Sequence, residues 1–81
     1  MRKYEVIWEK IKNADPDKWV VVNCANIAMI QTVINMVQVE KSAQQVTRRR
    51  LDLPQFGKLV IQREPESLRV LFRLKNNGDI L

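Results

Sequence analysis

Histidine is absent from the 81-residue chain and cysteine occurs once, and both shortages restrict the chemistry open to it. Without histidine the chain lacks the commonest proton shuttle and metal ligand, and neither a Ser-His nor a Cys-His catalytic pair can form. Cys24 has no second cysteine to pair with, and its place after an apolar run is typical of a small buried residue at the end of a strand. We therefore expect no enzyme activity, no metal and no cofactor.

Glycine and long apolar runs are also scarce. Gly57 and Gly78 are the only glycines, which excludes a glycine-rich loop for binding phosphate. No apolar run reaches the roughly 18 residues that a membrane-spanning helix needs, and the first residues do not resemble a signal peptide. These absences predict a cytoplasmic protein without a membrane partner.

The composition indicates one small folded domain. Hydrophobic residues make up 46% of the chain and charged residues 28%, which is too apolar for a disordered chain. The length leaves room for a single core, so we predict one α+β domain over residues 1–75 and a flexible tail over 76–81. A core of this size gives little net stability, and a homodimer that hides more apolar surface is therefore considered as well.

Positive charge is concentrated in the second half of the chain. Residues 1–40 carry equal numbers of cations and anions, whereas residues 41–81 carry nine cations against four anions and hold the whole net charge of +5. Such asymmetry predicts an acidic partner for the second half, with nucleic acid as the first candidate. The simpler alternative is a charged face that only interacts with solvent.

Hydrophobic spacing predicts a helix followed by a strand. A helix over about 3–13 is indicated by four apolar residues that share one helical face: Tyr4, Ile7, Trp8 and Ile11. Pro16 would end this helix. The β-branched segment 18–24 predicts a strand, in which we place Trp19 in the core.

A second, strongly apolar helix is predicted after Asn26, which can cap it. Its main apolar positions at helical spacing are Ile27, Ile30, Ile34 and Val37. Beyond these positions the same face becomes polar, which leaves two alternatives for residues 41–51. Either the helix ends near Glu40 and Ser42 caps a short separate helix ended by Pro54, or the long helix continues into solvent.

A β-hairpin is predicted at the end of the domain, from a strand over 58–64, a turn over 65–67 and a strand over 68–75. Alternation assigns one face to Leu68, Val70, Phe72 and Leu74, with Leu59 and Ile61 as cross-strand partners. The other face receives Arg69, Leu71, Arg73 and Lys75, together with Lys58, Val60 and Gln62. The predicted order is therefore α-β-α-(short α)-β-β.

Arginine-rich segments make nucleic-acid binding the favoured function. Arg48, Arg49 and Arg50 are expected on an exposed helical turn, and arginine binds phosphate and guanine edges through paired hydrogen bonds. The full set of expected binding residues is Gln44, Gln45, Thr47, Arg48, Arg49, Arg50, Lys58, Arg63, Arg69, Arg73 and Lys75. Because the few aromatic residues are assigned to the core, duplex DNA is favoured over single strands.

The segment 41–64, with its helix, its Gly-Lys-Leu-Val strand and the basic strand that follows, resembles the second half of a winged helix-turn-helix domain. The resemblance covers about half the chain. It implies that a recognition helix enters the major groove and that the hairpin acts as a basic wing. The groove-facing residues would be Gln44, Gln45, Thr47, Arg48 and Arg49, and the wing residues that meet phosphate or the minor groove would be Arg63, Arg69 and Arg73.

The alternative function is that of a protein-binding module. A small regulator or inhibitor, of the kind that phages and plasmids encode, could dock the same basic surface on an acidic partner protein. In that case the arginines would bind carboxylates instead of phosphates. Met29 and Met36, on the apolar second helix, could belong either to the core or to a partner seam.

Overall fold

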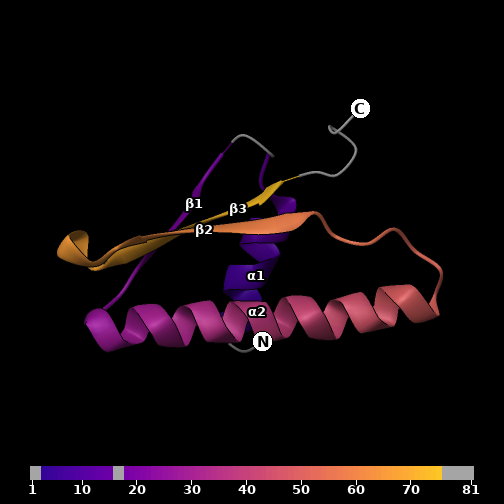
Figure 1. The fold of residues 1–81 in the computed structure, drawn as a ribbon, viewed down its shortest axis with the longest axis horizontal. Coiled ribbons are helices and arrows are strands. Elements are labelled where there is room, and N and C mark those ends of the chain that lie inside the picture. The colour runs from indigo at the N-terminus through magenta and orange to yellow at the C-terminus, as the bar shows by residue number, and fades with distance from the viewer. Residues whose placement is uncertain (1–2, 16–17, 76–81) are drawn as a thin grey trace.

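The computed structural model describes residues 3–15 and 18–75, which form two helices and a three-stranded antiparallel sheet (Figure 1). The elements follow in the order α1 (Lys3–Asn13), β1 (Val20–Asn23), α2 (Ile27–Arg50), β2 (Lys58–Glu64), a 3-10 turn (Pro65–Ser67) and β3 (Arg69–Lys75). The strand order across the sheet is β1-β3-β2, so β3 is central. The prediction of an α+β domain with a closing hairpin is confirmed, while the predicted tail over 76–81 lies outside the described residues.

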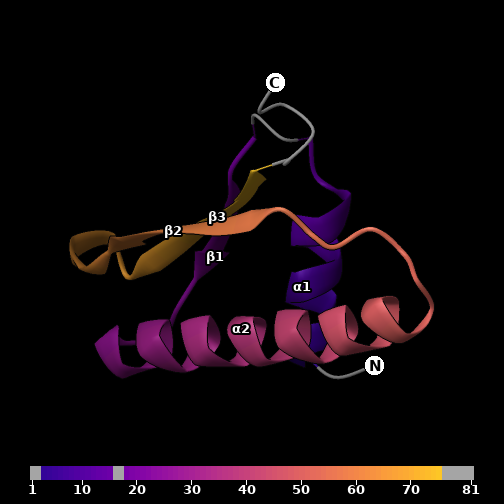
Figure 2. The same cartoon turned by 45° about the vertical axis from the view of Figure 1, so that its right-hand side comes forward.

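The core lies between the two helices and one face of the sheet, which we call the inner face. Its buried side chains come from α1, α2 and β3: Ile7, Trp8, Ile11, Ile30, Val33, Ile34, Val37, Val70 and Phe72. Figure 2 shows α1 standing across α2, with the sheet above α2 and beside α1. The opposite face of the sheet, the outer face, is covered by no helix of the described part of the chain.

The long helix α2 begins where the sequence predicts and continues to Arg50, well beyond its last buried apolar residue, Val37. Asn26 is its N-cap, and the side-chain Oδ1 accepts a hydrogen bond from the backbone N–H of Met29 at 3.0 Å. Residues 43–50 continue α2, so the separate short helix is not present. A winged helix requires a turn between two helices at this place, and the continuous helix has none.

The polar extension of α2 does not simply project into solvent, because part of it packs. The Lys12 Nζ of α1 donates to Gln44 Oε1 at 3.4 Å, and the guanidinium of Arg48 lies over the ring of Phe56. Lys12 lies in α1 and Phe56 lies in the connection between α2 and β2, so both contacts join the end of α2 to other parts of the chain. The side of α2 that faces the protein therefore makes apolar contacts up to Val37 and polar or cation–π contacts at Gln44 and Arg48.

A Schellman-type motif ends α2. The N–H of Leu53 donates to the carbonyl of Arg48, and the N–H of Asp52 donates to the carbonyl of Arg49. Asp52 takes the left-handed conformation (φ 56°) that glycine usually supplies at this position. Aspartate is among the residues that tolerate it, which is why a helix without a terminal glycine still ends sharply here.

The hairpin has the predicted register and faces. Val70 lies opposite Arg63 and Phe72 lies opposite Ile61, so the apolar side chains of β3 point toward the helices. One residue was wrongly placed: Leu68 is not part of β3. It caps the 3-10 turn in the left-handed conformation (φ 50°), and its carbonyl accepts from the N–H of Cys24 at 2.7 Å.

The cap at the start of α2 gives a first prediction. Asn26→Ala removes the acceptor for the Met29 N–H and should lower the free energy of unfolding by about 1 kcal/mol. Urea unfolding followed by circular dichroism measures this loss as a lower midpoint. Asn26→Ser, which keeps a capping oxygen, should stay close to the wild-type midpoint; equal losses in both variants would contradict the capping role.

Candidate nucleic-acid interface

The outer face of the sheet is the one extended surface on which several predicted binding residues meet. Its side chains follow from the strand register, because residues directly opposite one another in an antiparallel sheet share a face. From the hairpin turn toward the other end, the rows are Asn23–Arg69–Glu64, Val21–Leu71–Gln62, Arg73–Val60 and Lys75–Lys58. The face is therefore mixed, with an apolar middle and cations toward one end.

Three cations gather at the end of the outer face furthest from the hairpin turn. Lys58 and Lys75 are both exposed and lie directly opposite one another, which places their Cβ atoms about 5 Å apart. Arg73 is two residues before Lys75 on the same face. Like charges placed opposite one another destabilise a sheet, and an anion bound between them would relieve the repulsion.

Trp19 belongs to this outer face and not to the core, which corrects the sequence-based assignment. The guanidinium of Arg73 lies over the Trp19 ring, with the carbon 4.9 Å from the ring centroid. Trp19 precedes Val20, which faces inward opposite Phe72, and alternation therefore turns Trp19 outward. The apolar run 18–24 carries hydrophobic residues on both faces of the strand, so its composition alone did not reveal which side each one occupies.

The Nε of Arg73 is enclosed and has no hydrogen-bond partner among the described residues. The contact that the structure shows for the Arg73 guanidinium is therefore the cation–π contact with the Trp19 ring. A guanidinium held over an aromatic ring is preorganised, and less side-chain entropy is lost when it binds an oxyanion.

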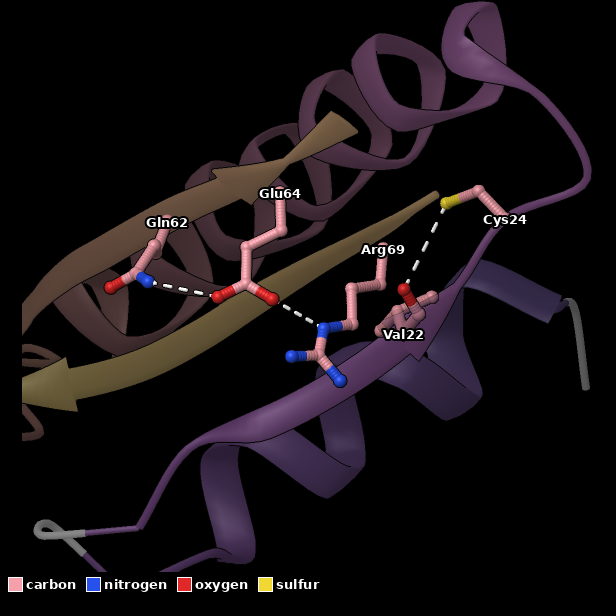
Figure 3. A network of polar contacts seen from close by, with 5 residues as sticks. All are labelled: Val22, Cys24, Gln62, Glu64 and Arg69. Carbon is pink, nitrogen blue, oxygen red and sulfur yellow. Dashed lines mark hydrogen bonds and ion pairs between the residues drawn. The ribbon is translucent and has the colours of Figure 1, made fainter. Parts of the chain in front are cut away.

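Near the hairpin turn the charges are balanced within the protein. Glu64 accepts a hydrogen bond from Gln62 Nε2 at 3.1 Å and forms an ion pair with Arg69 Nε (Figure 3). On the neighbouring strand, the free thiol of half-buried Cys24 contacts the carbonyl of Val22 at 3.9 Å. Arg69 is therefore already paired, and this end of the face is less suited to bind an anion than the Lys58 end.

Arg63 does not share the outer face with the other hairpin cations. Its register partner is Val70, whose side chain is buried beneath the sheet, so Arg63 is on the inner-face side at the exposed end of the hairpin. It borders a surface depression beside the 3-10 turn at 65–67. The predicted set of wing arginines is thus divided between two faces.

The arginine triplet at the end of α2 is also divided. Arg48 is half-buried: its guanidinium carbon is 4.4 Å from the centroid of Phe56, and its Nε donates to the carbonyl of Pro54 at 2.5 Å. Phe56 in turn meets the buried Trp8 edge to face, with 5.2 Å between ring centroids. Arg48 therefore holds the connection 51–57 against the core, and only Arg49 and Arg50 are exposed.

Two of the polar residues before the triplet already have hydrogen-bond partners within the protein. Gln44 accepts from Lys12, and the Thr47 hydroxyl donates to the carbonyl of Ala43 at 3.5 Å. Gln45 is half-buried. The last turn of α2 and the hairpin turn lie at opposite ends of the long axis (Figure 1), so Arg49 and Arg50 are remote from Arg63 and Arg69.

Comparisons with family models, curated proteins and solved structures give no match to this chain. Within residues 3–15 and 18–75, no group of histidine, cysteine, aspartate and glutamate side chains could hold a metal ion. In the same part of the chain, no helix is both long and apolar enough to cross a membrane. The function proposed below is therefore supported by the residues of this chain alone.

The contacts of Arg48 predict that it matters for stability. Arg48→Ala loses the stacking on Phe56 and the hydrogen bond to Pro54, and should lower the free energy of unfolding by about 1–2 kcal/mol. Arg49→Ala removes the same charge from an exposed position and should change it by less than about 0.5 kcal/mol. Urea midpoints of the two variants, measured side by side, test this difference; equal midpoints would refute the structural role of Arg48.

Proposed function

We propose that the protein binds nucleic acid, with duplex DNA as the expected ligand, through the outer face of its sheet. The observation that carries the proposal is the juxtaposition of Lys58, Arg73 and Lys75 on that face, beside Trp19. Cationic side chains that neutralise phosphates supply most of the affinity in non-specific DNA binding. Lys58 and Lys75 form no ion pair within the described residues, and such a like-charge pair is a natural place for a phosphate.

The size of the sheet supports a duplex. Three strands spaced about 4.8 Å apart span about 10 Å between the axes of the outer strands, which is comparable to the major-groove width of about 12 Å. Sheets and β-ribbons are established means of contacting a groove. A single strand would instead need several aromatic side chains for stacking, whereas Trp19 is the one aromatic residue that the described chain places on this face, and Arg73 covers one side of it.

The apolar middle of the same face supports a second candidate, an acidic partner protein. Val21 is 48% exposed, and half-buried Leu71 and Val60 lie in the neighbouring strands. Apolar residues next to cations are common at protein interfaces, where arginine and aromatic residues are enriched. Under this function the lysines would bind carboxylates instead of phosphates.

A matched pair of double variants tests the DNA-binding surface. Lys58→Gln with Lys75→Gln should weaken binding to a random duplex, because two phosphate contacts are lost. It should also reduce the slope of log affinity against log salt by about 2. Fluorescence anisotropy of a labelled duplex at a series of salt concentrations measures both quantities.

The control is Arg49→Gln with Arg50→Gln, which removes the same two charges from the end of α2. It should retain the larger part of the affinity and most of the salt slope. Equal losses in the two double variants would mean that net charge alone drives binding, and no binding of the wild type at low salt would exclude the proposed function.

A further inference from the structure

A surface hollow lies between α2 and the beginning of β2, and two lysines from these different elements border it. Its lining residues are Gln38, Lys41, Ser42, Lys58 and Leu59. The three helical residues occupy positions i, i+3 and i+4, so they share one flank of α2. Figures 1 and 2 both show β2 running above α2. The hollow therefore brings together polar residues that are far apart in the sequence.

The protein does not neutralise either lysine of the hollow. Lys41 follows the buried Val37 by one helical turn, so it lies on the side of α2 that faces the rest of the molecule, and it is half-buried. Lys58 is exposed at the start of the edge strand β2. Within the described residues neither lysine forms an ion pair, and no acidic side chain lines the hollow. Two cations that border one hollow repel each other, and a bound anion would remove this repulsion.

The backbone of β2 adds a donor at the same place. The N–H of Cys24 donates to the carbonyl of Leu68, so the even-numbered positions from Leu68 onward bond to β1. Successive residues of an antiparallel strand bond alternately to its two neighbours, and Lys75 therefore bonds to its partner Lys58 in β2. Leu59, the next residue, directs its N–H to the free edge of β2, where the described residues offer it no backbone acceptor.

The donors of the hollow match an oxyanion. The two ammonium groups, the Ser42 hydroxyl and the Gln38 amide can all donate hydrogen bonds, in addition to the Leu59 N–H. A carboxylate offers two oxygens in one plane, whereas a phosphate group offers three in different directions and can be met from the helix and from the strand at once. We infer that this hollow binds a phosphate group, which the ammonium groups of Lys41 and Lys58 hold from its two sides.

The phosphate group can come from a nucleic-acid backbone or from a small phosphorylated molecule. Lys58 also lies opposite Lys75 on the outer face, so the hollow continues the cationic end of that face at the edge of β2. We expect a duplex on the outer face to place one of its backbone phosphates there. This assignment of the source rests on the proposed function, whereas binding of the phosphate group itself does not.

Titration with inorganic phosphate tests the site. In amide NMR spectra of the full chain, phosphate should shift the signals of Ser42 and Leu59 in a saturable way, and chloride at matched ionic strength should not. Lys41→Gln and Lys58→Gln should each weaken this binding about fivefold, because one ammonium group is lost. Lys41→Arg keeps the charge and should bind like the wild type.

Lys10→Gln is the matched control, since it removes an exposed lysine from α1, outside the hollow. It should bind phosphate like the wild type, and amide signals dispersed as in the wild type would establish that the variants are folded. Equal responses to phosphate and chloride, or equal weakening in Lys41→Gln and Lys10→Gln, would overturn the inference.

Anisotropy with the labelled duplex decides the source of the phosphate group. If a backbone phosphate occupies the hollow, Lys41→Gln should reduce the slope of log affinity against log salt by about 1, and Lys10→Gln should leave it unchanged. A Lys41-dependent phosphate response without duplex binding would support the site and exclude the proposed function. Duplex binding that depends on Lys75, with no phosphate response at Leu59, would overturn the site and support the proposed function.

Discussion

The packing of α2 against α1 and the inner face of the sheet is the contact on which the other features depend. Ile30, Val33, Ile34 and Val37 are buried there with Trp8 and Phe72, which are fully enclosed. A domain of this size has only one such core, and it uses one face of the sheet and one side of the long helix. The outer sheet face and the outward side of α2 are therefore not part of this core.

These two surfaces differ in charge. The outer sheet face gathers Lys58, Arg73 and Lys75, so it suits an anionic ligand. The exposed residues of α2 from Ala28 to Thr47 are uncharged, and charge returns to this side of the helix only at Arg49 and Arg50.

The arginines in the second half of the chain have different structural roles. Arg48 stacks on Phe56 and fixes the connection after α2, Arg69 pairs with Glu64, and Arg73 stacks on Trp19. Of the arginine triplet, Arg49 and Arg50 are exposed on the last turn of α2, as the sequence predicted for all three, whereas Arg48 is half-buried. A run of like residues therefore does not imply a run of like functions, because each side chain meets a different partner in space.

The sequence by itself determined the features that depend on neighbours a few residues apart. Helical spacing gave α1, the Asn26 cap gave the start of α2, and strict alternation in 69–75 gave the faces of the hairpin. Tertiary structure decided the rest: Gln44 meets Lys12 across 32 residues, and Arg48 meets a ring that itself packs on Trp8. Polar side chains at the end of α2 and the apolar strand around Trp19 carry no periodic signal that selects one side, so their orientation follows only from the distant residues that they contact.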